Sequence, residues 1–107
     1  YRGAVVMILD SVSYTDISGQ RDNHTITVYA LSTCGFCKRA LSFLNDNNFA
    51  YKYIYVDQIP LETKNEIKEA LKNKFKVNVA FPFAVIDNSK YLVGFVEADW
   101  KKELGVN

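Results

Sequence analysis

The sequence predicts an α/β fold built on a mixed β-sheet. Apolar and polar residues alternate over 25–31 and over 51–56, which indicates two half-buried strands. Each of these strands is followed by apolar residues at helical spacing. The apolar runs 83–86 and 91–95, separated by turn-forming residues, indicate an antiparallel hairpin. The order predicted after residue 24 is therefore β-α-β-α-β-β-α, with a parallel, right-handed crossover in its first half.

Three helices are predicted within this order. The first runs from about Gly35 to Asp46 and ends in an Asn-rich stretch. The residues expected on its buried side are Ala40, Leu41, Phe43 and Leu44. The second begins at Pro60. Its expected apolar stripe consists of Ile67, Leu71 and Phe75. The lysines expected to face water are Lys64, Lys68 and Lys72. A solvated face explains these lysines better than a binding patch does. The third helix covers Ala98–Leu104 and is ended by Gly105.

Residues 1–24 form an N-terminal extension to this pattern. Within it, Ala4–Leu9 is apolar and β-branched, which predicts a short strand. Residues 10–23 are polar, and the composition of residues 18–23 predicts an exposed loop or turn. The predicted strand could lie at the sheet edge beside Tyr51–Val56 and cover apolar side chains there. The alternative is a poorly ordered leader.

The composition suits one domain with a single hydrophobic core. Of 107 residues, 49% are hydrophobic, and seven are Tyr and seven Phe. The formal net charge is +1 and no basic run stands out, so nucleic acid is not an expected partner. No apolar stretch approaches the length of a membrane span, and Val5–Leu9 is too short for a secretion signal. We expect a monomer. The first residue is Tyr1 rather than Met, which leaves open whether the native chain extends upstream.

The segment Cys34-Gly35-Phe36-Cys37 lies between a predicted strand and a predicted helix. Two thiols three residues apart at such a junction can close a disulfide, and the first amides of the helix can stabilise a thiolate on Cys34. The motif in this position predicts a dithiol oxidoreductase, which needs no bound metal or cofactor. Because the chain has two cysteines in all, a redox pair in the cytoplasm explains them better than the disulfide framework of a secreted protein.

Other uses of this motif receive less support. A zinc site needs four ligands, whereas the chain offers the two cysteines and one histidine, His24, so zinc would require a second chain. A structural disulfide is weaker still, because stabilisation grows with loop length and this loop is nearly the shortest possible. Two hypotheses of other classes stay open. In one, two chains share an iron–sulfur cluster through Cys34 and external thiols; in the other, the chain is a binding module with an inert dithiol.

The dithiol is followed by Lys38-Arg39, and Phe81-Pro82 precedes the third predicted strand. With these features the chain resembles the glutaredoxin branch of the thioredoxin-like fold over residues 25–104. The resemblance implies a glutaredoxin-like domain at 25–107. It also implies that Pro82 is cis and lies against the dithiol, with the backbone of Phe81 pairing with a bound thiol substrate.

Four segments depart from the glutathione-binding pattern of that family. Gly35-Phe36 replaces Pro-Tyr, and Leu31-Ser32-Thr33 lacks the usual upstream lysine. Ala80-Phe81-Pro82 replaces Thr-Val-Pro, and Gly94-Phe95-Val96-Glu97 replaces Gly-Gly-polar-Asp. Each departure weakens a glutathione site, whose carboxylates need cations and free backbone donors. The Gly-Phe pair resembles the redoxins that serve ribonucleotide reductase and are reduced by thioredoxin reductase. We therefore expect slow turnover with glutathione and faster turnover with a thioredoxin-reductase-type donor.

The two cysteines have different expected roles. Cys34, at the helix start, is the nucleophile that attacks a protein disulfide, and Cys37, one helical turn on, resolves the mixed disulfide. Lys38 adds positive charge nearby, although an exposed lysine contributes little. Phe36 and Phe81 offer an apolar surface around the thiol, or serve plain packing. The residues expected to contact substrate are Phe36, Lys38, Phe81, Pro82, Gly94 and Phe95.

Overall fold

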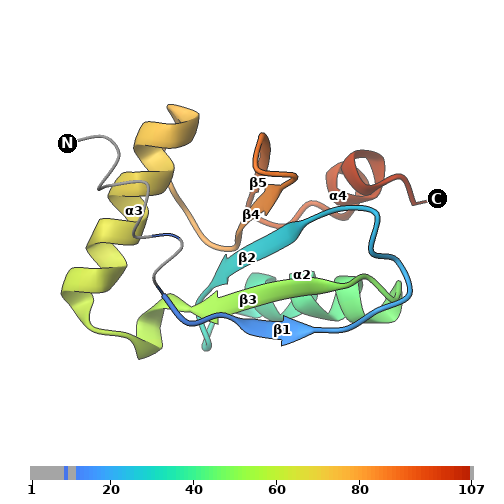
Figure 1. Ribbon diagram of the computed structural model, residues 1–107, viewed down its shortest axis with the longest axis horizontal. Coiled ribbons are helices and arrows are strands. Elements are labelled where there is room, and N and C mark those ends of the chain that lie inside the picture. Colours follow the sequence, from blue (N-terminus) through green and yellow to red (C-terminus); the bar gives the residue numbers. More distant parts are fainter. Residues whose placement is uncertain (1–8, 10–11, 107) are drawn as a thin grey trace.

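The structure, a computed structural model, describes Leu9 and residues 12–106. In this part of the chain a five-stranded mixed sheet has the strand order β1-β3-β2-β4-β5 (Figure 1). The strands are β1 (Thr15–Ile17), β2 (Ile26–Ala30), β3 (Tyr51–Tyr55), β4 (Phe83–Ile86) and β5 (Lys90–Val93). The helices are α2 (Gly35–Asp46), the short 3-10 helix η1 (Val56–Gln58), α3 (Leu61–Phe75) and α4 (Glu97–Leu104).

The predicted order of elements after residue 24 is confirmed. β2 pairs parallel with β3 across the α2 crossover, and it pairs antiparallel with β4 on its other side. β4 and β5 form the predicted antiparallel hairpin. Val56, predicted to end a strand, instead begins η1. The register opposes Tyr29 and Phe83, so the ends of β2 and the start of β4 meet at one end of the sheet.

The extension contributes a strand from residues 10–23, a segment predicted to be polar and to contain no strand. Thr15–Ile17 pairs antiparallel with β3, opposing Thr15 to Tyr53 and Ile17 to Tyr51. The sequence of these three mostly exposed residues does not predict a strand. They form one because the edge of β3 provides hydrogen-bonding partners for them. The strand predicted at Ala4–Leu9 lies, apart from its last residue, outside the described residues. The place beside β3 that was assigned to it is occupied by β1.

The sheet is covered on both faces, and the alternation along β2 separates the two layers. Ile26, Val28 and Ala30 pack with α2 and α4, while Tyr29 packs with α3. The predicted buried side of α2 is confirmed, with Ala40, Leu41, Phe43 and Leu44 all buried. On α3, Ile67 and Leu71 are buried and Phe75 is partly buried. Packing in the first of these layers includes residues of β2 and α2, so the start of α2 and its cysteines lie at the end of β2.

Gly19 fits tightly against the turn between α2 and β3. A Cβ placed on it would lie 2.5 Å from the carbonyl oxygen of Asn48 and from the backbone of Phe49. The neighbouring Arg21 N–H donates to the same Asn48 carbonyl at 2.8 Å, and the Arg21 carbonyl accepts from Ala50 N–H at 2.9 Å. The close approach of two backbones therefore requires glycine here.

Gly19→Ala is expected to lower the free energy of unfolding by about 1–3 kcal/mol, because the turn must move to admit a methyl group. Urea unfolding measures this, with the exposed neighbour Ser18→Ala as a matched control. Equal unfolding midpoints for the two variants would contradict the packing described here.

Candidate active site

Cys34 is the N-cap of α2 and is partly exposed. Its Sγ accepts a hydrogen bond from the backbone N–H of Cys37 at 3.4 Å. The pKa of the Cys34 thiol is lowered from its ordinary value, first by a hydrogen bond from the Cys37 side chain and then by the amides of Cys37 and Phe36; slight burial opposes this. A thiolate at the open end of a helix is also stabilised by the helix dipole. Cys34 is therefore the thiol that ionises first.

Cys37 is fully buried, one turn into α2. Burial raises the pKa of its thiol to about 12, and the nearby negative charges of Cys34 and Asp57 act in the same direction. The backbone N–H of Leu31 donates to its Sγ at 3.3 Å, which lowers the pKa but does not offset burial. The two thiols of the motif thus differ sharply in ionisation, with the exposed one favoured as the thiolate.

Phe81 and Pro82 continue β4 backwards past the end of β2, toward the segment that leads to Cys34. The Phe81–Pro82 peptide bond is cis, as the resemblance implied, and Pro82 is buried. The Pro82 carbonyl accepts from the N–H of Gly94 at 2.8 Å, so the turn after β5 is attached to the start of β4. The predicted residues 81, 82 and 94 are therefore joined at the end of the sheet where α2 begins.

The aromatic residues predicted around the thiols differ in exposure. Phe36 is 57% exposed, with the guanidinium of Arg39 at 5.5 Å from its ring centroid. Phe95 is partly buried, with its ring 5.8 Å from Phe43 and 5.3 Å from Trp100, so most of it serves packing of α4. Val96, the next residue in the chain, was not among the predicted contact residues and is 56% exposed. Phe36 and Val96 are thus among the exposed apolar residues of the described part of the chain, and Val93, which pairs with Phe83 at the same end of the sheet, is also exposed.

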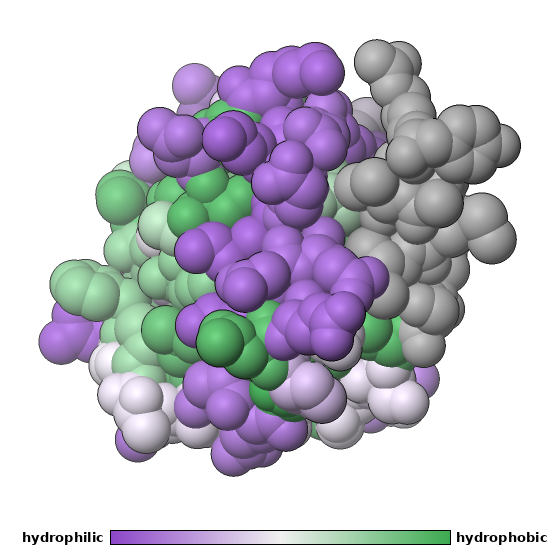
Figure 2. Space-filling view, turned by 90° about the vertical axis from the view of Figure 1, so that its left-hand side faces the viewer, coloured by the Kyte–Doolittle hydropathy of each residue, from purple (hydrophilic) through white to green (hydrophobic). Residues whose placement is uncertain are grey.

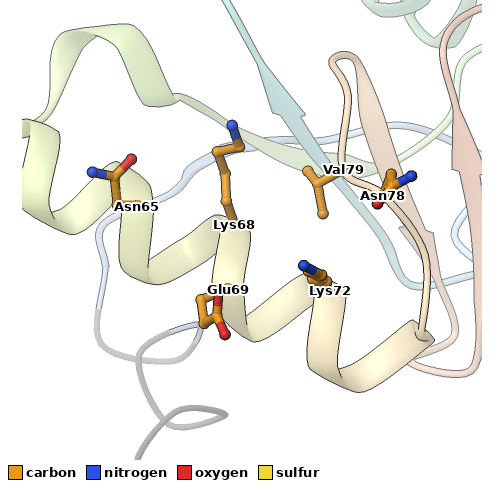
Figure 3. A pocket seen from close by; sticks show the side chains of 6 residues that line it. All are labelled: Asn65, Lys68, Glu69, Lys72, Asn78 and Val79. Carbon is orange, nitrogen blue, oxygen red and sulfur yellow. The ribbon is translucent and has the colours of Figure 1, made fainter.

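A groove of about 400 Å³ lies between α3 and the segment before Phe81. It is lined by Asn65, Lys68, Glu69, Lys72, Asn78 and Val79. Figure 3 shows the polar side chains of α3 on one side of the groove and Asn78 and Val79 on the other. Lys68 and Lys72 are exposed, as predicted for a solvated face, but they also line this groove. The outer surface of α3 is the hydrophilic band in Figure 2, and apolar side chains gather beside it.

Two residues of the site region were not found from sequence. Asp57 of η1 accepts hydrogen bonds from the backbone N–H of Ser32 at 2.9 Å and from its hydroxyl at 2.5 Å. These hydrogen bonds, mainly the one from the hydroxyl, hold the pKa of the Asp57 carboxyl below its usual range. The segment before Cys34 is therefore attached to the end of β3 by a carboxylate, a contact between residues 25 positions apart.

Metal and membrane features can be assessed for the same part of the chain. Among residue 9 and residues 12–106, no three His, Cys, Asp or Glu side chains gather where they could hold a metal ion. None of the helices described here is both long and apolar enough to cross a bilayer.

Comparisons with known proteins agree with this geometry. The protein-family model for glutaredoxin matches residues 26–90. Glutaredoxin 1 of Rickettsia conorii is 35% identical over 65 residues, which cover 61% of this chain and 60% of that protein. The match thus spans about three-fifths of the length of this curated relative.

Two solved structures are similar over most of the chain. The glutaredoxin from Methanosarcina mazei Go1 has a TM-score of 0.73 and 31% identity, covering 88% of this chain and 89% of its own. Methanosarcina acetivorans methanoredoxin has a TM-score of 0.72 and 29% identity, covering 88% of this chain and 96% of its own. Both therefore share the thioredoxin-like arrangement of sheet and helices.

Proposed function

Because this chain belongs to the glutaredoxin family of thiol–disulfide oxidoreductases, we propose that it reduces protein disulfides with Cys34 as nucleophile and Cys37 as resolving thiol. The observation that carries this proposal is the difference between the two thiols. The pKa of Cys34 is lowered, mainly by hydrogen bonds, whereas burial raises that of Cys37 to about 12. A direct test is reduction of insulin disulfides with dithiothreitol as reductant. Acceleration over dithiothreitol alone is expected, and none would favour a binding module with an inert dithiol.

The exchange proceeds in two steps that conserve electrons. The Cys34 thiolate attacks one sulfur of the substrate disulfide, forms a mixed disulfide and releases the other sulfur as a thiolate. Cys37 then loses its proton and attacks the Cys34 sulfur, which releases the second substrate thiolate and leaves a Cys34–Cys37 disulfide. Both electrons of the reduction come from the dithiol, so an external reductant must restore it.

Substrate contacts follow from the surface around Cys34. The exposed ring of Phe36 and the exposed Val96 offer apolar area to a protein partner. The backbone of Phe81, next to the buried Pro82, is the proposed pairing site for the segment that carries the disulfide. Lys38, exposed on α2, adds positive charge at the rim. A monomer in the reducing cytoplasm is the proposed working state.

For the reductant, we propose that a thioredoxin-reductase-type enzyme serves this chain faster than glutathione does. The segment Leu31-Ser32-Thr33, where an upstream lysine is expected, contains no cation, and its Leu31 packs against the core. A protein donor can use the apolar area at Phe36 and Val96, whereas a tripeptide with two carboxylates depends on cations. The Gly94-Phe95 pair extends this proposal to the substrates of the ribonucleotide-reductase-serving redoxins. Steady-state rates with both donors test the preference, and higher catalytic efficiency with glutathione would overturn it.

Glutathione is the second candidate donor, and one observation favours it. The groove beside the segment leading to Phe81 is lined by the ammonium groups of Lys68 and Lys72, which suit a carboxylate. None of the ion pairs in the described part of the chain involves either lysine.

Lys68→Glu is therefore expected to lower kcat/KM with glutathione by about tenfold, since it replaces an attractive charge with a repulsive one. The rate with a protein reductase should change by less than about twofold. Lys102→Glu, an exposed charge reversal on α4, is the control for net charge. A loss of equal size with both donors would show that Lys68 does not discriminate between them.

A further inference from the structure

The carboxylate of Asp57 holds the segment before the dithiol with both of its oxygens. Oδ1 accepts from the Ser32 backbone N–H at 2.9 Å, and Oδ2 accepts from the Ser32 hydroxyl at 2.5 Å. Ser32 lies two residues before Cys34. Two hydrogen bonds to one charged group are stronger and more directional than two neutral ones. The position of the Ser32 backbone is therefore set by η1, outside the helix that carries the cysteines.

The residue next to Ser32 contacts both cysteines through its main chain. The N–H of Leu31 donates to Cys37 Sγ at 3.3 Å. Its carbonyl accepts from the N–H of Cys34, also at 3.3 Å. Any shift of Ser32 moves the peptide unit that carries the Leu31 carbonyl, and with it the orientation of Leu31. The hydrogen bonds from Ser32 to Asp57 are thus one residue away from the Leu31 N–H that donates to the buried Cys37 Sγ.

We propose that Asp57 is a positioning residue of the dithiol, which holds the Leu31 amide on the sulfur of Cys37 through its two hydrogen bonds to Ser32. The proposal rests on the proposed function, because the Leu31 amide matters most when Cys37 resolves a mixed disulfide. In that step the buried Cys37 sulfur must become negative. A fixed N–H donor stabilises the charge as it develops, at no cost of reorganisation.

Asp57 also acts on Cys37 through its charge, in the opposite sense. The ionisable groups around the Cys37 thiol are Cys34 on α2, Tyr55 on β3 and Asp57 itself, and Lys64 of α3 lies near the Asp57 carboxylate. A negative carboxylate disfavours a second negative charge nearby. Removing the charge while keeping the hydrogen bonds should therefore help resolution, whereas removing the hydrogen bonds should hinder it.

Two substitutions separate these effects. Asp57→Asn keeps an oxygen that accepts from the Ser32 N–H and removes the charge. Asp57→Ala removes both. The probe is dithiobis(nitrobenzoate), a small aromatic disulfide. Attack by Cys34 releases one coloured thiolate in a first phase, and resolution by Cys37 releases the other in a second phase. The full-length wild type should show both phases, and a missing second phase would overturn the proposed roles of the cysteines themselves.

For Asp57→Ala, the second phase is expected to slow about tenfold at neutral pH, while the first phase changes by less than about twofold. Asp57→Asn should resolve the mixed disulfide at least as fast as the wild type. The increase of its second-phase rate with pH should begin at a lower pH than in the wild type. Asp22→Ala, in the exposed loop before β2, is the control for loss of a carboxylate.

Ser32→Ala provides an independent variant if Asp57→Ala does not fold. It should slow the second phase less than Asp57→Ala, and the double variant should be no slower than Asp57→Ala alone. The proposal is overturned if Asp57→Ala resolves at the wild-type rate, if it slows both phases equally, or if Asp57→Asn is as slow as Asp57→Ala.

Discussion

Cys34→Ser is expected to abolish disulfide reduction, while Cys37→Ser retains the attack and accumulates the mixed disulfide. A serine hydroxyl at the start of α2 is not ionised near neutral pH, so the first step loses its nucleophile. We expect a decrease in turnover on the order of a thousandfold or more for Cys34→Ser. Intact-mass measurement after incubation with a disulfide substrate should show the adduct on Cys37→Ser and none on Cys34→Ser. An adduct on Cys34→Ser alone would reverse the assignment.

The pH dependence of alkylation checks the same assignment without substitution. The pKa of Cys34 is lowered, so its alkylation rate should rise with pH only up to that lowered value and then level off. The pKa of Cys37 is raised to about 12, so its thiolate forms only in strongly basic solution. At neutral pH iodoacetamide should therefore label Cys34 almost exclusively, as peptide mapping would show. Faster labelling of Cys37 would contradict the geometry of both thiols.

Trp100→Ala is expected to have the largest effect on stability, lowering the free energy of unfolding by about 3–5 kcal/mol. Trp100 is 1% exposed and packs edge-on against Phe43 and Phe95. Its indole N–H donates to the carbonyl of Gly94 at 3.1 Å. The substitution leaves a cavity under α4 and removes this hydrogen bond.

Trp100→Phe separates the two contributions. It keeps most of the packing and loses the indole donor, so the expected decrease is about 1–2 kcal/mol. Val96→Ala, an exposed position, should change stability by less than about 0.5 kcal/mol. Urea unfolding of the reduced proteins measures all three. If Trp100→Ala unfolds at the same midpoint as Val96→Ala, α4 does not hold the core as described.

The sequence was sufficient for those elements whose signal is periodic and long. The apolar spacing of α2 and α3 repeats over several residues and correctly indicates which side of each helix is buried. The alternation along β2 predicts a half-buried strand, whereas all five of its residues are buried, because helices cover both faces of the sheet. The cis Phe81–Pro82 bond came from the resemblance of the motif, since a trans bond is favoured for any proline by base rates. The roles proposed for the two cysteines rest on their place at the start of α2 and stay a prediction.

The features that were missed depend on single contacts between distant residues. β1 has three residues with no apolar alternation, and its pairing is decided by the open edge of β3. Asp57 reads in sequence as an ordinary polar residue after a strand, and its partner Ser32 lies 25 positions earlier. The partial burial of Phe95 depends on α4, which brings Trp100 against it. Such pairings follow from tertiary packing and have no local pattern that would predict them.

The position of β1 has a consequence for how molecules of this protein meet one another. β1 occupies the hydrogen-bonding edge of β3, whose outer residues include Tyr51 and Tyr53. An uncovered strand of this aromatic kind is a template for intermolecular pairing and for aggregation. The opposite edge, β5, begins with Lys90, which forms an ion pair with Glu103 at 3.2 Å. The short strand β1 thus blocks intermolecular pairing at one edge of the sheet, and the charged Lys90 disfavours it at the other. Removing the residues before Ile26 would expose the tyrosine-rich edge of β3 to fibril-like association.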